Sequence, residues 1–513
     1  MNDDVDSQEE VLSFLADPAS HGGRQVQRID THAASVFLAG DRALKIKRAV
    51  RFPFLDYSTL GKRKQACAAE LAVNAPYAPQ IYRGVLPITR EADGRLAIGG
   101  NGTPVEWAVE MRRFDETRTL DHLAGEIGEE LADALGFSVA AAHEQAPVVD
   151  AAPWIAALET YLDQNLEAFR ERPDLFEPEA VAALDRESRK TYARIKPLLA
   201  ARGKLGRVRR GHGDLHLGNI VLIDERPVLF DAIEFDPLIA TGDVLYDLAF
   251  LLMDLCERGL AQAANTVLNR YLIETRRIDD LDGLAALPFF LSHRAAIRAK
   301  VTAARMQRVK ATEQAPIARS ARAYFAFARR AIEPPAPKFI AIGGLSGSGK
   351  TKLARALAPH IAPMPGAVIV RSDVERKALL GVAETDKLPE EAYAPAVSER
   401  VYAVLLDKAR RILAAGHSAI VDAVFARPQE RGAVAAAAAA AKSANVRLRG
   451  LFLTANLGTR LARVGARARD ASDADARVAR AQERYDLGAL DWTPIDASGT
   501  VEETLARARA ALD

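Results

Sequence analysis

The fold of this chain is decided by the stretch Gly211-His212-Gly213-Asp214-Leu215-His216-Leu217-Gly218-Asn219-Ile220, followed by Leu229-Phe230-Asp231. Residues 220–223 and 228–230 are predicted to form two short buried strands, because both are apolar runs separated by a polar turn. This hairpin would return Asp231 to the side of Asn219, where a carboxylate and an amide oxygen could hold a magnesium ion. Asp214 could accept the proton of an attacking hydroxyl group. The stretch therefore predicts phosphoryl-transfer chemistry rather than a polar loop with incidental acids.

The spacing H-x-D-L-x-x-x-N is that of the kinase catalytic loop, with Gly213 where protein kinases carry arginine. Together with Phe230-Asp231 and the pattern Asp243-x-x-x-Asp247-Leu248-Ala249, it resembles the aminoglycoside phosphotransferase and choline kinase family. The resemblance implies a protein-kinase-like fold of two lobes, ATP and Mg²⁺ as cofactors, and a small molecule as acceptor.

Composition describes an ordinary globular protein. The chain has 513 residues, 49% hydrophobic and 27% charged, so two or three domains are expected. Its 69 basic and 68 acidic residues nearly cancel, which argues against a general nucleic-acid-binding surface. Two cysteines, Cys67 and Cys256, cannot make a disulfide framework. The acidic N-terminus and the absence of a long apolar run predict a cytoplasmic protein without membrane segments.

Residues 34–47 are predicted to form a strand, a Gly-Asp turn and a second strand. A kinase-like N-terminal lobe places there the lysine that holds the α- and β-phosphates, and we assign Lys45 to that role. Lys47 or Arg48 is expected to be an outward-facing companion, and a solvated strand edge is the alternative. Glu70, in a predicted helix, is the expected partner of Lys45. No G-x-G-x-x-G motif precedes this strand, so the segment that would cover the phosphates in this lobe is unassigned.

A basic helical face is predicted between residues 292 and 305. Arg294, Arg298 and Arg305 recur at helical spacing. Such a face on a late helix could bind an anionic acceptor through Arg294 and Arg298, and a merely solvated face is the alternative.

A proline-rich segment at 334–337 reads as a linker, and an apolar strand at 339–342 opens a second core. The strand leads into G-x-x-x-x-G-K-T, the phosphate-binding P-loop. Its glycines let backbone N–H groups close around phosphate oxygens at a helix N-terminus. Lys350 is expected to reach the β- and γ-phosphates, and the Thr351 hydroxyl to bind magnesium. The predicted nucleotide-binding residues are Gly344, Ser346, Gly347, Ser348, Gly349, Lys350 and Thr351.

Strands alternate with helices beyond the P-loop, which predicts a parallel three-layer sheet. Two predicted strands end at Asp373 and Asp422, at the sheet edge where such proteins bind ligands. We expect Asp422 to support the magnesium ion, Asp373 to be the base, and Asp373 and Arg376 to contact the acceptor.

Basic residues at 460–469 precede a small polar loop and look like the mobile lid of small P-loop kinases. Arg463 and Arg467, at i and i+4, are expected to close over the phosphates. The alternative is an exposed basic helix. Residues 338–513 resemble the P-loop kinases that include gluconate kinase and zeta-toxin-like enzymes.

The predicted fold class is α/β multidomain. Residues 1–333 would form a protein-kinase-like bilobal α+β domain, with lobes at about 25–115 and 116–333, and residues 338–513 a P-loop domain with a parallel sheet. The halves together resemble bacterial fusions of an aminoglycoside phosphotransferase-like domain with a C-terminal ATP-binding domain.

The predicted function is a bifunctional ATP-dependent kinase acting on hydroxyl groups of anionic or polyhydroxy small molecules. Two alternatives remain: an ATP-sensing regulatory protein with one catalytic half, or a nucleotide or RNA 5′-hydroxyl kinase in the P-loop half. Near-neutral charge offers no evident groove for a nucleic-acid strand.

Overall fold

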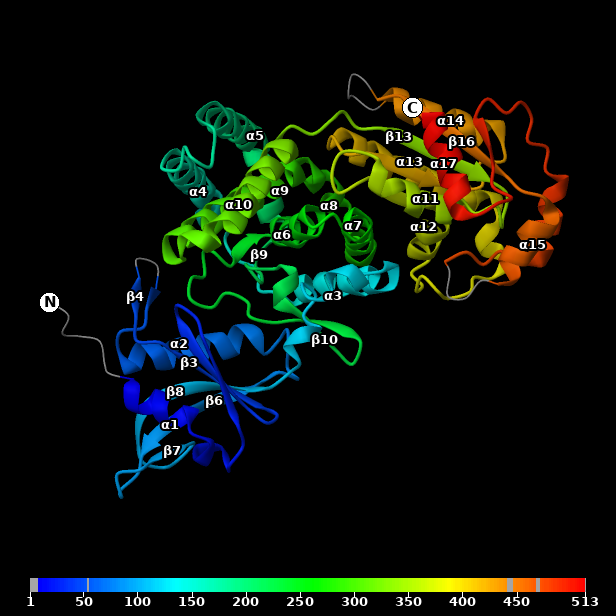
Figure 1. Cartoon of the computed structure of the whole chain (residues 1–513). Coiled ribbons are helices and arrows are strands. Elements are labelled where there is room, and N and C mark those ends of the chain that lie inside the picture. The colour runs from blue at the N-terminus through cyan, green and yellow to red at the C-terminus, as the bar shows by residue number, and fades with distance from the viewer. Residues whose placement is uncertain (1–7, 53–54, 441–445, 467–470, 513) are drawn as a thin grey trace. The chain divides into compact units, whose positions relative to one another are not determined.

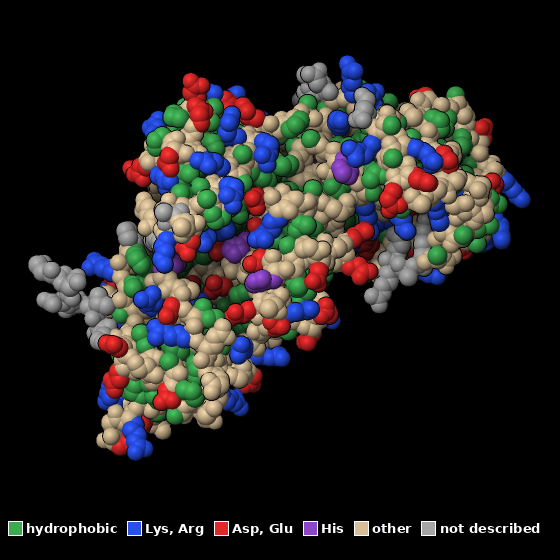
Figure 2. All heavy atoms as spheres, viewed as in Figure 1, with side chains coloured by type: hydrophobic (Ala, Val, Ile, Leu, Met, Phe, Trp, Pro, Cys, Tyr) green, Lys and Arg blue, Asp and Glu red, His purple; other side chains and the backbone are tan. Residues whose placement is uncertain are grey.

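The computed structural model describes residues 8–52, 55–440, 446–466 and 471–512. The chain forms two compact units, one of residues 1–157 and 203–251, the other of residues 158–202 and 252–513 (Figure 1). Among the described residues, no helix is both long and apolar enough to cross a membrane. On the face seen in Figure 2, Lys and Arg side chains are interspersed with Asp and Glu, in keeping with the net charge of +1.

An antiparallel six-stranded sheet in the order β1-β2-β3-β8-β6-β7 dominates the first unit. Its strands are β1 (Val26–Asp30), β2 (Ala34–Ala39), β3 (Arg42–Lys47), β6 (Tyr82–Arg90), β7 (Leu96–Ile98) and β8 (Thr103–Arg112). Helix α1 (Glu9–Ala16) packs Val11 and Leu15 with Phe37, Leu44 and Ile46 of the sheet into one core. Helix α2 (Leu60–Asn74) runs beside β8 and β6. The predicted strand-turn-strand at 34–47 is confirmed by β2 and β3.

Two short strand pairs flank the loop at 211–219. The hairpin of β10 (Ile220–Ile223) and β11 (Arg226–Leu229) follows that stretch, as predicted, with Ile220 opposite Leu229. Strands β9 (Val208–Arg210) and β12 (Thr241–Asp243) pair on its other side. Further helices that begin in this unit are α3 (Glu129–Gln145), α4 (Ala151–Arg170) and α6 (Val244–Glu257).

The second unit contains helices and a parallel sheet. Its helices before the sheet are α5 (Pro178–Lys204), α7 (Ala261–Thr275), α8 (Ile278–Gly283), α9 (Leu287–Arg305) and α10 (Ala311–Ile332). Helices α9 and α10 lie side by side along most of their length (Figure 1). Residues 334–338 are neither helix nor strand.

The five-stranded parallel sheet has the order β14-β15-β13-β16-β17. The strands are β13 (Phe339–Gly344), β14 (Val368–Arg371), β15 (Ala419–Asp422), β16 (Leu448–Thr454) and β17 (Thr493–Asp496). The helices are α11 (Lys350–Leu357), α12 (Ser372–Leu379), α13 (Pro395–Ala414), α14 (Pro428–Ala440), α15 (Leu457–Gly465), α16 (Ala476–Ala481) and α17 (Val501–Leu512). Helices α11 and α17 pack together, and α13 packs with α12, α14 and β15. The predicted fold class, a kinase-like fold followed by a P-loop domain, is confirmed.

Strand β14 lies at the edge of this sheet, and α7 covers its backbone. The side-chain amides of Asn265 and Asn269 donate to the carbonyl oxygen of Ala367 at 3.0 and 3.2 Å. The Ile369 N–H donates to Asn269 Oδ1 at 2.7 Å. Both asparagines are buried. Two side chains of one helix therefore satisfy backbone groups that an edge strand would otherwise leave unpaired.

Candidate active sites

The loop at 211–219 is held by a buried carboxylate. Asp247 accepts the backbone N–H groups of His212 at 2.8 Å and Gly213 at 3.0 Å, and it contacts His143 Nε2 at 3.2 Å. Burial lowers the pKa of His212, despite the nearby Asp247 charge, and its Nε2 lies 2.9 Å from the carbonyl oxygen of Phe230. A neutral His212 therefore ties this loop to the segment that carries Asp231.

Gly213 has the left-handed φ of +81°, and a Cβ there would come within 2.9 Å of Ala240 Cα. The loop consequently has no room for the arginine that protein kinases carry at this position.

Asp214 and Asn219 lie together, as predicted. The Asn219 amide nitrogen donates to the Asp214 carbonyl at 2.9 Å and to its carboxylate at 3.1 Å. His216 Nε2 lies 3.4 Å from the same carboxylate, while its Nδ1 accepts the Gly218 N–H. The Asp214 side chain is 39% exposed, so an acceptor hydroxyl can reach it. Because the Asn219 nitrogen is used, its oxygen is the atom left for a metal ion.

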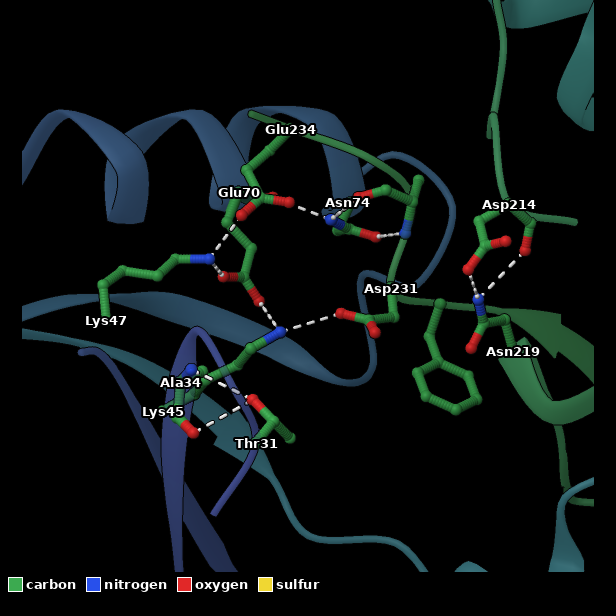
Figure 3. A network of polar contacts seen from close by, with 12 residues as sticks. Thr31, Ala34, Lys45, Lys47, Glu70, Asn74, Asp214, Asn219, Asp231 and Glu234 are labelled. Carbon is green, nitrogen blue, oxygen red and sulfur yellow. Dashed lines mark hydrogen bonds and ion pairs between the residues drawn. The ribbon is translucent and has the colours of Figure 1, made fainter. Parts of the chain in front are cut away.

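Lys45, Glu70 and Asp231 form a second part of this site (Figure 3). Lys45 Nζ lies 2.8 Å from both Glu70 Oε1 and Asp231 Oδ1. Burial raises the pKa of the Glu70 carboxyl, but Lys45 and Lys47 outweigh burial and bring it down to about 2. Burial likewise opposes the charge on Lys45, whereas Asp231 and Glu70 more than compensate and raise its pKa. Both groups are therefore ionised at neutral pH.

The expectation that Lys47 faces outward is wrong. Its side chain is 3% exposed, less than the 16% of Lys45, and its Nζ lies 2.5 Å from Glu70 Oε2. It also forms an ion pair with Glu234 Oε1. Strand alternation places both lysines on one face, and in this fold α2 covers that face and brings a carboxylate to both.

The segment after β11 is shaped around Asp231, whose φ of +59° is unusual for a residue other than glycine. Its N–H donates to the Tyr82 hydroxyl at 3.2 Å. Asn74, in α2, accepts the Ala232 N–H at 2.7 Å and donates to the Ala232 carbonyl at 3.2 Å. These contacts hold a strained backbone in place, as is common at functional sites.

Residues of this first site fit a magnesium nucleotide by their chemistry. The Asp231 carboxylate is 46% exposed and supplies a hard oxygen ligand. Lys45 supplies a buried, charged ammonium for phosphate oxygens.

The P-loop of the second unit contains glycines with positive φ and contacts Arg460 and Gln482. Gly347 and Gly349 have φ of +84° and +96°, and a Cβ on Gly347 would lie 2.5 Å from the Arg460 carbonyl oxygen. The Ser346 N–H donates to Gln482 Oε1 at 2.7 Å. The buried Ser348 hydroxyl has no hydrogen-bond partner among the described residues, so it is available to a phosphate oxygen. The loop fits a phosphate group.

Thr351 and Asp422 meet at the end of the P-loop. The Thr351 hydroxyl donates to Asp422 Oδ2 at 2.6 Å, and Arg371 Nε lies 3.7 Å from the same oxygen. Lys350 Nζ lies 3.4 Å from the Leu345 carbonyl oxygen. A hydroxyl and a carboxylate side by side are suitable oxygen ligands for magnesium.

Asp373 and Arg376 both lie on α12. Burial and, to a smaller extent, Asp422 raise the pKa of Asp373, although Arg371 and Lys350 oppose the shift. The Arg376 guanidinium donates to the Ala392 carbonyl at 2.7 Å and lies 4.8 Å from the centre of the Tyr393 ring.

Of the two arginines predicted for the lid, the structure describes Arg463 but not Arg467. Arg463 Nη1 donates to the Ser348 carbonyl at 3.3 Å, so the structure brings this residue to the P-loop. Arg467 lies outside the described residues. Arg460, also basic but not chosen from the sequence, is buried and donates to the Ser346 and Ala479 carbonyls at 2.9 and 3.0 Å.

The basic residues of α9 do not share one environment. Arg294 is buried, Arg298 is half-buried with its guanidinium 5.6 Å from the Tyr324 ring centre, and Arg305 is exposed. A uniform solvated face therefore does not describe this helix. The acceptor role of Arg294 and Arg298 remains a prediction.

Several supporting residues were missed from the sequence, namely Asn74, Tyr82, Glu234, Arg460 and Gln482. Two of them had a signal in the sequence: Glu234 lies three residues after Asp231, and Arg460 opens the basic run 460–469. The others act through contacts between elements that spacing does not reveal.

The fold and these two groups of residues define a phosphotransferase of the kinase type. A family model described as "Phosphotransferase enzyme family" matches residues 27–287, and one described as "AAA domain" matches residues 339–486. The chain belongs to the phosphotransferase enzyme family and carries a C-terminal P-loop kinase domain. Such domains imply the use of ATP, normally with Mg²⁺.

Relatives of the whole chain include uncharacterized proteins of Mycobacterium tuberculosis and Mycobacterium bovis. Each is 30% identical over 493 residues, which is 93% of this chain and 94% of the relative. A choline/ethanolamine kinase family protein from Mesorhizobium loti is similar at 15% identity and a TM-score of 0.39, covering 64% of this chain and 95% of that one. A gluconokinase from Sinorhizobium meliloti is similar at 19% identity and a TM-score of 0.25, covering 34% and 91%.

Proposed function

We propose that this protein is a bifunctional ATP-dependent kinase that phosphorylates hydroxyl groups of small molecules at two separate sites. The observation that supports the proposal is that one chain holds two separate groups of residues whose chemistry suits phosphate and metal binding. One set is Lys45, Glu70, Asn219 and Asp231 beside Asp214, and the other is Lys350, Thr351 and Asp422 in the P-loop domain. The proposed boundary between the two kinases is the segment 334–337.

At the first site, bound magnesium ATP would supply the phosphoryl group. Lys45 would bind the α- and β-phosphates, held in place by Glu70. Asn219 and Asp231 would bind the metal ion. Asp214 would accept the proton of the acceptor hydroxyl, since its carboxylate is accessible and oriented by the Asn219 amide.

At the second site, backbone N–H groups of the P-loop other than those of Gly344, Ser346 and Ser348, which donate within the protein, would hold the phosphates, with Lys350 beside them. Thr351 and Asp422 would bind the metal ion. Asp373 would take the acceptor proton, because its carboxyl lies close enough to Asp422 and Lys350 for their charges to act on it. Arg376 would contact the acceptor, and Arg463 and Arg467 would neutralise developing charge.

The acceptors are expected to be anionic or polyhydroxy metabolites. Arg294 and Arg298 would recognise an anionic group of an acceptor. Polycationic acceptors suit a site rich in acids, whereas this helix carries arginines.

The test uses the full chain with γ-labelled ATP and separate pools of metabolites, nucleosides and RNA. Asp214→Asn should lower one set of labelled products by ~10²–10⁴ and leave nucleotide binding intact, as loss of a positioned base does. Lys350→Ala should abolish a different set of labelled products. Label transferred only to nucleosides or RNA would favour a 5′-hydroxyl kinase. Turnover of Asp214→Asn close to that of the wild type would refute the assignment of the base.

A further inference from the structure

The first site contains a second buried ion pair that the proposed reaction does not use. Lys47 lies between the carboxylates of Glu70 and Glu234, and these three side chains are 3%, 0% and 9% exposed. The Tyr57 hydroxyl donates to Glu234 Oε1 at 3.2 Å, and the Tyr57 ring centre lies 5.5 Å from Lys47 Nζ. Figure 3 shows Glu70 placed between the two lysines, with Asp231 and Glu234 at the ends of the series.

Both lysines connect the same three elements. Lys45 joins β3 to α2 through Glu70 and to the segment after β11 through Asp231. Lys47 joins β3 to α2 through the other oxygen of Glu70 and to the same segment through Glu234. The two connections differ in exposure, because Asp231 is 46% exposed whereas Glu234 is 9% exposed.

This difference matters when a nucleotide binds. Under the proposed function, on which this inference rests, Lys45 turns to phosphate oxygens and Asp231 turns to the metal ion. The ion pair between Lys45 and Asp231 is then broken. Lys47 and Glu234 bind neither phosphate nor metal in the proposed reaction, so the ion pair between them can persist.

We propose that Lys47 and Glu234 are positioning residues that hold the Asp231 segment and Glu70 in place while Lys45 and Asp231 engage magnesium ATP. Lys47 supplies a second counter-ion to Glu70 while Lys45 shares its charge between Glu70 and the phosphates. Glu234 keeps the segment that carries Asp231 attached to β3. Asn74 assists through its two hydrogen bonds to Ala232.

A purely structural role is the competing explanation, because buried ion pairs also occur as parts of a protein core. The two explanations differ in one measurable property. A positioning role couples the ion pair to the magnesium-dependent part of ATP binding, whereas a structural role lowers stability alone.

The experiment measures ATP affinity of the full chain by calorimetric titration, with magnesium and with EDTA, in a Lys350→Ala background that disables the P-loop site. The ratio of the two dissociation constants is the magnesium effect. Glu234→Gln and Lys47→Met should reduce this effect about tenfold, with a much smaller change in metal-free affinity. Lys47→Arg should restore part of it because the charge is retained. The matched control is Glu10→Gln, which breaks the exposed ion pair with Arg90 and should change nothing.

Variants that melt at a lower temperature but keep the wild-type magnesium effect would overturn the proposal. The ion pair of Lys47 and Glu234 would then have a structural role alone. If the variants do not fold, hydrogen exchange of the wild-type protein tests the proposal instead. The amides of residues 232–236 should stay protected from exchange when magnesium ATP binds. A loss of their protection would overturn the proposal. Absence of any ATP binding in the Lys350→Ala chain would instead refute the proposed function of this site, and the positioning role with it.

Discussion

Replacing Glu70 by glutamine would remove the shared counter-ion of two buried lysines while nearly preserving the size of the side chain. The substitution mimics the protonated form of Glu70, so the stability that depends on its charge should be lost. Among the described residues, Asp231 would remain as the carboxylate partner of Lys45 and Glu234 as that of Lys47. Such a loss is costly because a buried charge is left with less compensation.

The magnitude follows from the pKa of Glu70, which is lowered from 4.5 to about 2. At about 1.36 kcal/mol per pKa unit, an interval of about 2.5 corresponds to about 3 kcal/mol of folding free energy. The sign follows from the direction of the shift. Because the pKa is lowered in the folded state, this stability is fully present above pH 4.5 and is lost as the pH falls toward about 2.

The assay is hydrogen exchange of amides in α2 and β3, corrected for the intrinsic effect of pH, for wild type and Glu70→Gln between pH 7 and pH 3. The difference in opening free energy should be about 3 kcal/mol at pH 7 and should fall to less than half of that at pH 3. Glu10→Gln, which breaks an exposed ion pair in the same unit, should show little difference at either pH.

Two results would refute this reasoning. A pH-independent difference would mean that Glu70→Gln acts by altered packing rather than by charge. A wild-type protein whose α2 and β3 amides open as easily as those of the variant at pH 7 would mean that Glu70 and the lysines add no net stability.

The remaining predictions concern ligands. Thr351→Val should weaken magnesium-dependent ATP binding at the P-loop about 10- to 150-fold, because a hydrogen bond to a charged group contributes ~1.5–3 kcal/mol, whereas Thr351→Ser should bind like the wild type. Lys350→Ala should reduce the nucleotide stoichiometry from two to one in a titration, and a wild-type stoichiometry of one would contradict two active kinases. The double change of Arg294 and Arg298 to glutamine should raise the KM for an anionic acceptor at least ~tenfold with little effect on the KM for ATP. Equal acceptor KM values would return both arginines to a structural role.

Local spacing was enough to find the parts of the sites that are contiguous in sequence. The loop at 211–219, the hairpin that follows it and the P-loop are each one short segment whose geometry depends on neighbouring residues. The parallel sheet was predictable for a similar reason, since alternating strands and helices leave few arrangements.

Other features depend on contacts between distant segments. The burial of Lys47 could not be read from strand alternation, which assigns a face but does not say what covers it. Glu234 and Lys47 are 187 positions apart, and Arg460 and Ser346 are 114 apart. The sequence pattern of α9 failed similarly, because helical spacing cannot tell that Arg294 is buried while Arg305 is exposed.

The cover that α7 provides for the edge of β14 has a consequence for producing this protein in pieces. A fragment that begins at the proline segment would lack Asn265 and Asn269, and its outer strand would present bare amide and carbonyl groups to other molecules. Strand edges of that kind recruit further strands, so such a fragment is expected to precipitate or to form fibrils. A fragment that begins upstream of residue 261 retains the cover. A fragment meant to contain the P-loop domain should therefore begin ahead of α7, although the proposed boundary between the two kinases lies at 334–337.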